Sequence, residues 1–154
     1  MPKAKKQSAL RRSAEEVTIT PTQYGEILKC VDLRDIYLKE IKSTLYSREL
    51  TGRASLKFDE SANVLSVAEN VATIEVSYNL KAKCGRNRLF TSRIKYAVLF
   101  DCKGDIPDGF FELYNKHSLP LQTFPYLREC VNSMISRMGL PPLILPLRKF
   151  LVGD

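Results

Sequence analysis

The strongest constraint on the fold is a strict alternation of apolar and polar residues between Thr73 and Cys84. Side chains of a β-strand point alternately to its two faces, so this pattern predicts an antiparallel strand with one face buried and the other in water. Its polar face carries charged side chains such as Glu75 and Lys81. The predicted buried residues are Ile74, Val76, Tyr78, Leu80, Ala82 and Cys84.

The next strand follows after a short loop at residues 85–87, which begins with glycine. A loop of this length predicts a β-hairpin, and the apolar faces of both strands coincide if Cys84 lies opposite Arg88. A shift by one residue would expose one of the two apolar faces, so this register is strongly preferred. It gives two further pairs, Val76 with Tyr96 and Tyr78 with Ile94.

Two earlier segments, 33–46 and 52–61, are also rich in strand-forming residues. In the first of them Leu33 and Ile36 are out of phase, and a β-bulge between these two residues would return both to one face. The chain therefore has four predicted strands, with turn-forming sequences between them.

Three helices are predicted around these strands. Thr20 and Gln23 form a capping-box pattern before a short helix of at most about three turns. A second short helix is expected within residues 109–120. Thr123 is a candidate N-cap for a longer amphipathic helix that ends at Gly139. The predicted fold class is α+β, a four-stranded antiparallel sheet with a long C-terminal helix and shorter helices packed on one face.

Composition narrows the class of protein. The chain has 154 residues and a net charge of +7, and cations are dense in the first dozen residues. We predict a basic flexible tail over residues 1–19 and one domain over 20–154. No hydrophobic signal segment or membrane-spanning run is found, and the scattered cysteines suit a reducing cytoplasm, so a soluble intracellular protein without membrane insertion is expected. A solvated tail makes specific nucleic-acid binding unlikely.

No pattern of catalytic residues is present in the sequence. His117 is the only histidine and has no cysteine or acidic neighbour in sequence, and Cys130 falls on the predicted long helix. The four cysteines form no CxxC motif, and no phosphate-binding loop or metalloprotease motif occurs. We therefore predict no enzyme activity, no catalytic residue, no metal and no cofactor.

The segment of residues 124–146 resembles the C-terminal signature of the SecB chaperone family, which reads Phe-Pro-Tyr-x-Arg-Glu, then a long helix, then Pro-x-Leu-x-Leu. The strand order and the placement of the helices are also similar from about Leu33 onwards. The residues that carry the resemblance are Phe124, Pro125, Tyr126, Arg128, Glu129, Cys130, Ser136, Arg137, Pro142, Leu143 and Leu145.

This resemblance implies an ATP-independent holdase that binds unfolded clients and assembles as a dimer of dimers. The apolar seam of the long helix is expected to provide the oligomer interface: Phe124, Leu127, Val131, Met134, Ile135 and Met138. The aromatic segment before that helix is expected to form the client groove, with two strand residues beneath it. The candidate client-binding residues are Phe58, Tyr78, Phe110, Phe111, Tyr114, Leu119 and Leu121.

Export SecB proteins present acidic residues to the SecA motor, and this sequence departs from that pattern. Asp35 matches that pattern, but Lys39 and Arg93 occupy expected acidic positions, and an acidic C-terminal tail is replaced by residues 148–154. We therefore favour a chaperone of a toxin–antitoxin–chaperone module, with an antitoxin as client. The alternatives are a preprotein-export chaperone that delivers clients to SecA, and a nucleic-acid-binding protein that uses its basic tail.

Overall fold

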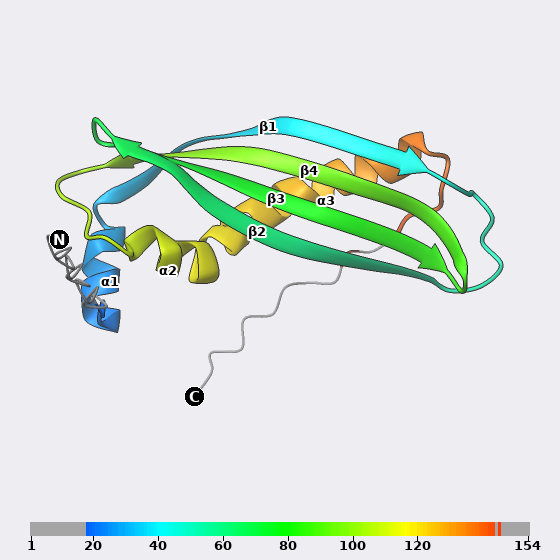
Figure 1. Ribbon diagram of the computed structural model, residues 1–154, viewed down its shortest axis with the longest axis horizontal. Helices are drawn as coiled ribbons and strands as arrows, with labels where there is room; N and C mark the ends of the chain where they lie inside the picture. Colours follow the sequence, from blue (N-terminus) through cyan, green and yellow to red (C-terminus); the bar gives the residue numbers. More distant parts are fainter. Residues whose placement is uncertain (1–17, 144, 146–154) are drawn as a thin grey trace, which may run out of the picture.

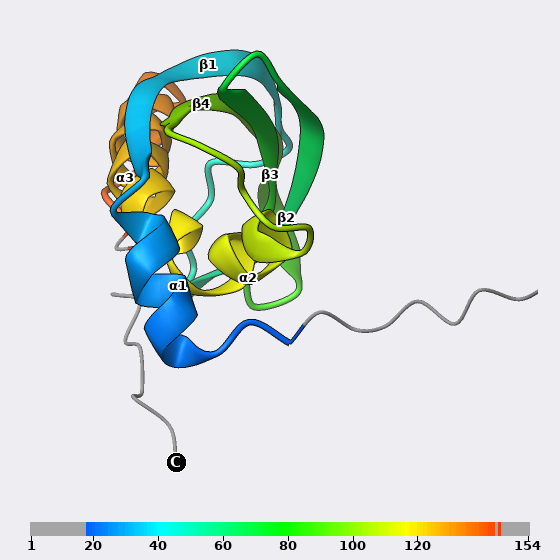
Figure 2. The ribbon, with the colours of Figure 1, turned by 90° about the vertical axis from the view of Figure 1, so that its left-hand side faces the viewer.

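The computed structural model describes residues 18–143 and 145. Residues 1–17 of the tail predicted over 1–19, and the C-terminal residues 148–154, lie outside the described part. Four antiparallel strands form one sheet in the order β1-β4-β3-β2, and the helices lie on its concave side (Figures 1 and 2). The predicted fold class is confirmed. The elements are α1 (Pro21–Leu28), β1 (Val31–Leu45), β2 (Ala54–Ala68), β3 (Val71–Cys84), β4 (Asn87–Cys102), α2 (Phe110–His117) and α3 (Leu119–Arg137).

The register predicted for the β3–β4 hairpin is confirmed along most of its length, with Val76 opposite Tyr96 and Tyr78 opposite Ile94. Near the turn the prediction is wrong by one residue, because Cys84 pairs with Asn87 and not with Arg88. A bulge there adds one residue on β4 and allows a tighter turn, which Gly85 enters at a φ of 59°. Glycine takes such an angle without a steric penalty.

The predicted bulge between Leu33 and Ile36 is confirmed, and the strand carries a second shift between Leu38 and Glu40 that the sequence analysis missed. Each bulge inserts one residue, so the apolar side chains of β1 stay on the inner face of the sheet. Strand β2 is also longer than predicted and ends only at Ala68. It joins β3 through Glu69 and Asn70, both at positive φ, as a tight hairpin turn requires.

Helix α3 begins four residues before the predicted N-cap. Thr123 is fully buried inside the helix, where its hydroxyl donates to the carbonyl of Leu119 and forms a hydrogen bond of 2.5 Å with the Tyr78 hydroxyl. Pro120 occupies the first turn, a position that needs no backbone donor, and Pro125 lies within the helix. A cap-like threonine therefore serves as a buried contact between α3 and the sheet.

The core lies between the inner face of the sheet and helices α2 and α3. The largest fully buried side chains include Tyr78, Phe90, Phe100, Phe110, Leu119, Leu127 and Ile135.

The predicted capping box of α1 is confirmed. The N–H of Gln23 donates to the Thr20 hydroxyl, and the Gln23 side chain accepts from the N–H of Thr20. The α1 helix then packs by placing the ring of Tyr24 5.3 Å from that of Phe110.

The end of α3 at Gly139 is confirmed. The N–H of Gly139 donates to Ser136 O and that of Leu140 to Ile135 O, which is the pair of bonds of a Schellman motif. Gly139 has a φ of 67°, and a Cβ there would lie 2.7 Å from the guanidinium of Arg48. The Arg48 guanidinium donates to the carbonyl of Gly139 at 3.4 Å, which ties the β1–β2 loop to the end of the helix.

We expect Gly139→Ala to lower the free energy of unfolding by about 1 kcal/mol, because an L-residue is strained in the left-handed region. Gly25→Ala is the matched control, since Gly25 lies within α1 and nothing stands within 4 Å of its added Cβ. That change should stabilise the helix by up to about 1 kcal/mol. Urea unfolding of both variants tests the assignment, and a loss at Gly25 as large as that at Gly139 would contradict it.

Candidate functional site

Helix α3 crosses the inner face of the sheet diagonally (Figure 1). A groove lies along each of its flanks. Its first half contacts β3 through Thr123 and Tyr78, and its second half reaches β1, where the Ser43 hydroxyl donates to the Met134 sulfur. One flank faces the edge strand β1 and the other faces the chain segment that follows Gly139.

The first groove, between α3 and β1, has a volume of 630 Å³. Its walls are largely apolar. Among the described residues β1 is an edge strand of the sheet, so the side of its backbone turned away from β4 has no neighbouring strand. We call this the edge groove. It is lined by Ile36, Leu38, Ile41, Ser43, Tyr96, Tyr126, Glu129, Cys130, Ser133, Met134, Arg137 and Met138.

The apolar side chains of β1 that lie on the inner face of the sheet, which we call its inner row, are mostly exposed. Leu38 keeps 47% of its surface and Ile41 43%, although both lie on the face of the sheet that elsewhere forms the core. Leu33 and Leu45 on the same row are exposed as well. Exposed apolar residues gathered in this way mark a binding surface.

The opposite edge strand, β2, has a different character. Its inner row includes Glu60, which lies opposite Tyr78 in the sheet register. An inward-pointing charge on an edge strand discourages another strand from pairing there. The two edges of the sheet are therefore not equivalent, and β1 is the one suited to a further strand.

The structure divides the predicted oligomer-interface residues into two groups. Phe124, Leu127, Val131 and Ile135 are buried in the core of the same chain, where their side chains pack against the sheet. Met134 and Met138 line the edge groove, although Met134 is also buried in the same core. The sequence analysis missed Leu38 and Ile41, because nothing local shows that β1 lies at the edge of the sheet.

The predicted client-binding residues are also divided. Tyr78, Phe110, Phe111, Tyr114 and Leu119 are buried. The rings of Phe110, Phe111 and Tyr114 pack on each other, and two of them also pack on Phe100. The ring of Tyr78 packs instead on Phe58 and Tyr96. Burial raises the pKa of Tyr114 to about 12. These side chains present little surface to a client, and their role in client binding stays a prediction.

Two of the predicted client-binding residues do reach the surface. Leu121 is 55% exposed, and Phe58 is half-buried on the inner row of β2, with its ring 6.2 Å from that of Phe124. Leu121 stands about two helical turns before Arg128 and about three before Asn132, so these three share one flank of α3. That flank belongs to the second groove.

The second groove has a volume of 570 Å³ and lies between α3 and the segment after Gly139. We call it the tail groove. Apolar side chains from that segment, including the half-buried Leu143, form one wall. The complete lining is Arg128, Asn132, Ile135, Ser136, Leu140, Pro142, Leu143 and Leu145.

Neither groove has an activated nucleophile among the described residues. Burial raises the pKa of the Cys130 thiol, and burial likewise raises the pKa of Tyr96, whose hydroxyl donates to the carbonyl of Tyr126. A thiol in such surroundings stays protonated and packs as a small apolar group. Across residues 18–143 and 145 no cluster of metal-binding side chains occurs and no helix is long and apolar enough to cross a membrane.

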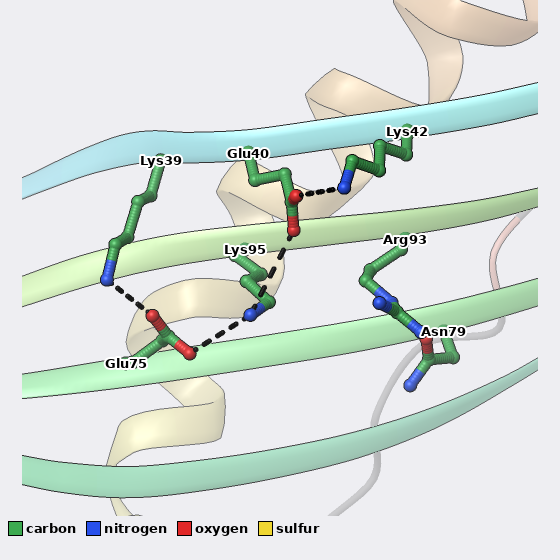
Figure 3. Close-up of polar contacts among 7 residues, drawn as sticks. All are labelled: Lys39, Glu40, Lys42, Glu75, Asn79, Arg93 and Lys95. Carbon is green, nitrogen blue, oxygen red and sulfur yellow. Dashed lines mark hydrogen bonds and ion pairs between the residues drawn. The ribbon is translucent and has the colours of Figure 1, made fainter.

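Charged side chains on the outer face of the sheet form a ladder of ion pairs (Figure 3). Lys39, the residue inserted by the second bulge of β1, reaches across β4 to Glu75 on β3 at 2.5 Å, and Lys95 bridges Glu75 and Glu40. The hydrogen bond from Lys39 is the main cause that lowers the pKa of Glu75, and it raises the pKa of Lys39. The ladder links three strands of the sheet.

We expect the ladder to stabilise the fold at neutral pH and to fail in acid. The folded-state pKa of Glu75 lies below its ordinary value of 4.5. The stability that the ionised carboxylate contributes is therefore complete above pH 4.5, and it is lost as the pH falls through the folded-state pKa. Glu75→Gln should lower the urea midpoint at pH 7 and flatten the loss of stability at acidic pH. The same loss of stability with falling pH in the wild type and the variant would contradict this.

Comparison with known proteins identifies the class. Residues 26–150 match the family described as preprotein translocase subunit SecB. The SecB protein-export protein of Methylibium petroleiphilum is 27% identical over 115 residues, which cover 75% of this chain and 69% of that protein. That of Burkholderia vietnamiensis is 30% identical and covers 75% of this chain and 71% of its own length.

A solved structure agrees with this assignment. A SecB-like chaperone from Mycobacterium tuberculosis, in complex with a peptide from the HigA1 antitoxin, superposes with a TM-score of 0.69 at 20% identity, covering 81% of this chain and 96% of that one. The fold is therefore that of a SecB-like chaperone. The chain belongs to the SecB family.

Proposed function

We propose that the protein is an ATP-independent holdase that captures unfolded polypeptides. The observation that carries the proposal is the apolar surface that residues 18–143 and 145 leave exposed on β1 and at Leu121, beside the two grooves that flank α3. A holdase needs no catalytic group, since binding the unfolded state shifts its equilibrium by mass action.

The edge groove suits assembly with a second copy of the chain. The exposed row on β1, the unpaired backbone of that strand and the two methionines of α3 form one continuous surface. A second β1 can extend the sheet and cover Leu38 and Ile41, whereas Glu60 disfavours pairing at β2. Two such dimers, joined through a second surface, would form the dimer of dimers that the family resemblance implies.

The tail groove suits the client. It lies on the flank of α3 away from β1, so it stays open when the edge groove is covered. Leu121 is exposed on the same flank of α3, nearer the first turn of the helix, and Phe58 packs against Phe124 of that helix. A client held there in extended form would place alternate side chains against the apolar wall.

We favour an antitoxin as the dedicated client. The similar chaperone of M. tuberculosis was solved with an antitoxin peptide, and Lys39 and Arg93 stand on the outer face where an acidic docking surface for SecA is expected. Preprotein export with delivery to SecA is the second candidate, because the similar curated proteins from Methylibium and Burkholderia are protein-export proteins.

Two experiments test these proposals. In the first, a chemically unfolded substrate is diluted into buffer without nucleotide, and light scattering follows its aggregation. We expect stoichiometric suppression by the protein, and no suppression would refute holdase activity. In the second, the protein is captured from its host and the bound chains are identified. A single antitoxin supports the dedicated role, and a mixture of signal-bearing preproteins supports export.

A further inference from the structure

The outer face of the sheet divides into a half where cations are paired and a half where they are not. In the paired half, Glu75 contacts Lys39 and Lys95 (Figure 3), and Asp101 contacts Arg34. Toward the β3–β4 turn the face is basic and exposed. We call this half the basic end, and it consists of Lys57, Lys81, Lys83, Arg86, Arg88 and Arg93.

Like charges stand directly opposite each other in the basic end. Lys57 on β2 lies opposite Lys81 on β3, and Lys83 on β3 lies opposite Arg88 on β4. Directly opposed like charges destabilise a sheet. In the described part of the chain no carboxylate forms an ion pair with any member of the basic end, although Asp59 stands in the adjoining row.

We propose that the basic end docks an acidic polypeptide segment. Cations at alternate positions of a strand, such as Lys81 and Lys83, repeat at about 6.7 Å, which is also the repeat of alternate carboxylates in an extended peptide. The neighbouring strands add further cations within about 5 Å on either side. A segment with alternating acidic residues can therefore meet several of these cations at once and relieve their mutual repulsion.

The same surface fits a nucleic acid poorly. Single strands are held by base stacking on exposed aromatic rings, and one face of the Tyr46 ring, beside the basic end, is already occupied by the guanidinium of Arg88 at 3.8 Å. The outer face is also convex, so a duplex could touch it only along a line (Figure 2). Since both grooves lie on the inner face, an acidic partner and an unfolded client could bind together.

The test uses the full chain and a fluorescein-labelled peptide of about eight Glu-Ser repeats, whose carboxylates have the required spacing in extended form. Fluorescence anisotropy measures its affinity for the wild type, for Lys57→Ser/Lys81→Ser, and for the matched control Lys5→Ser/Lys6→Ser. The control removes the same charge from the N-terminal segment. A thymidine oligonucleotide with a similar number of phosphates is the competing probe.

We expect the sheet variant to bind the peptide about tenfold more weakly, the control to bind within about twofold of the wild type, and the wild-type affinity to fall as salt rises. The melting temperature of the sheet variant should be unchanged or higher, because a repulsive pair is removed. Equal losses in both variants would overturn the proposal, and so would tighter binding of the oligonucleotide than of the peptide. Neither result bears on holdase activity.

Discussion

Leu38→Asp/Ile41→Asp is expected to convert the assembled protein into monomers that remain folded. Both side chains are apolar and more than two-fifths exposed in the single chain, so aspartates there meet water in the monomer. In an assembly that covers the edge groove they would become buried charges without partners, at a cost of about 3–5 kcal/mol for each contact that is lost. Sedimentation velocity gives the mass, and circular dichroism checks the fold.

Leu65→Asp/Val67→Asp is the matched control on the other edge of the sheet. These residues are each 52% exposed on β2, and the substitution changes hydrophobicity and charge by the same amount. We expect this variant to assemble as the wild type does. A wild type that sediments as a monomer would refute assembly altogether, and loss of assembly in the control alone would move the interface to β2.

The β3–β4 hairpin shows what the sequence determines locally. The period of two and the short loop allow only one register that buries both apolar faces, so the pairing of Val76 with Tyr96 could be predicted. The bulge beside Cys84 could not, because the change of one residue at a turn depends on how Leu89 packs into the core.

The start of α3 and the exposure of β1 depend on tertiary structure. Thr123 has the residue type of an N-cap, but its hydroxyl is used by Tyr78, which lies far away in sequence. Leu38 and Ile41 have the pattern of core residues, and only the strand order β1-β4-β3-β2 places them at an edge beyond the cover of α3. Pattern identifies an apolar face, and strand order decides whether the same chain covers it.

The aromatic cluster of α2 is the part of the candidate site where folding and client binding are hardest to separate. Phe111 is buried against Phe100 and Tyr114, whereas Leu121 is exposed one turn into α3. Phe111→Ser should therefore lower the free energy of unfolding by about 3–5 kcal/mol, as the loss of a buried aromatic does. Leu121→Ser should change it by no more than about 0.5 kcal/mol.

Client capture should respond in the opposite way. We expect Leu121→Ser to weaken suppression of aggregation at a temperature where it is fully folded, because it removes apolar surface beside the tail groove. Phe111→Ser, measured well below its melting temperature, should still capture clients, because its side chain has little exposed surface to contribute. If Phe111→Ser abolishes capture while folded and Leu121→Ser leaves it intact, clients bind at the aromatic cluster of α2, and the tail-groove proposal is wrong.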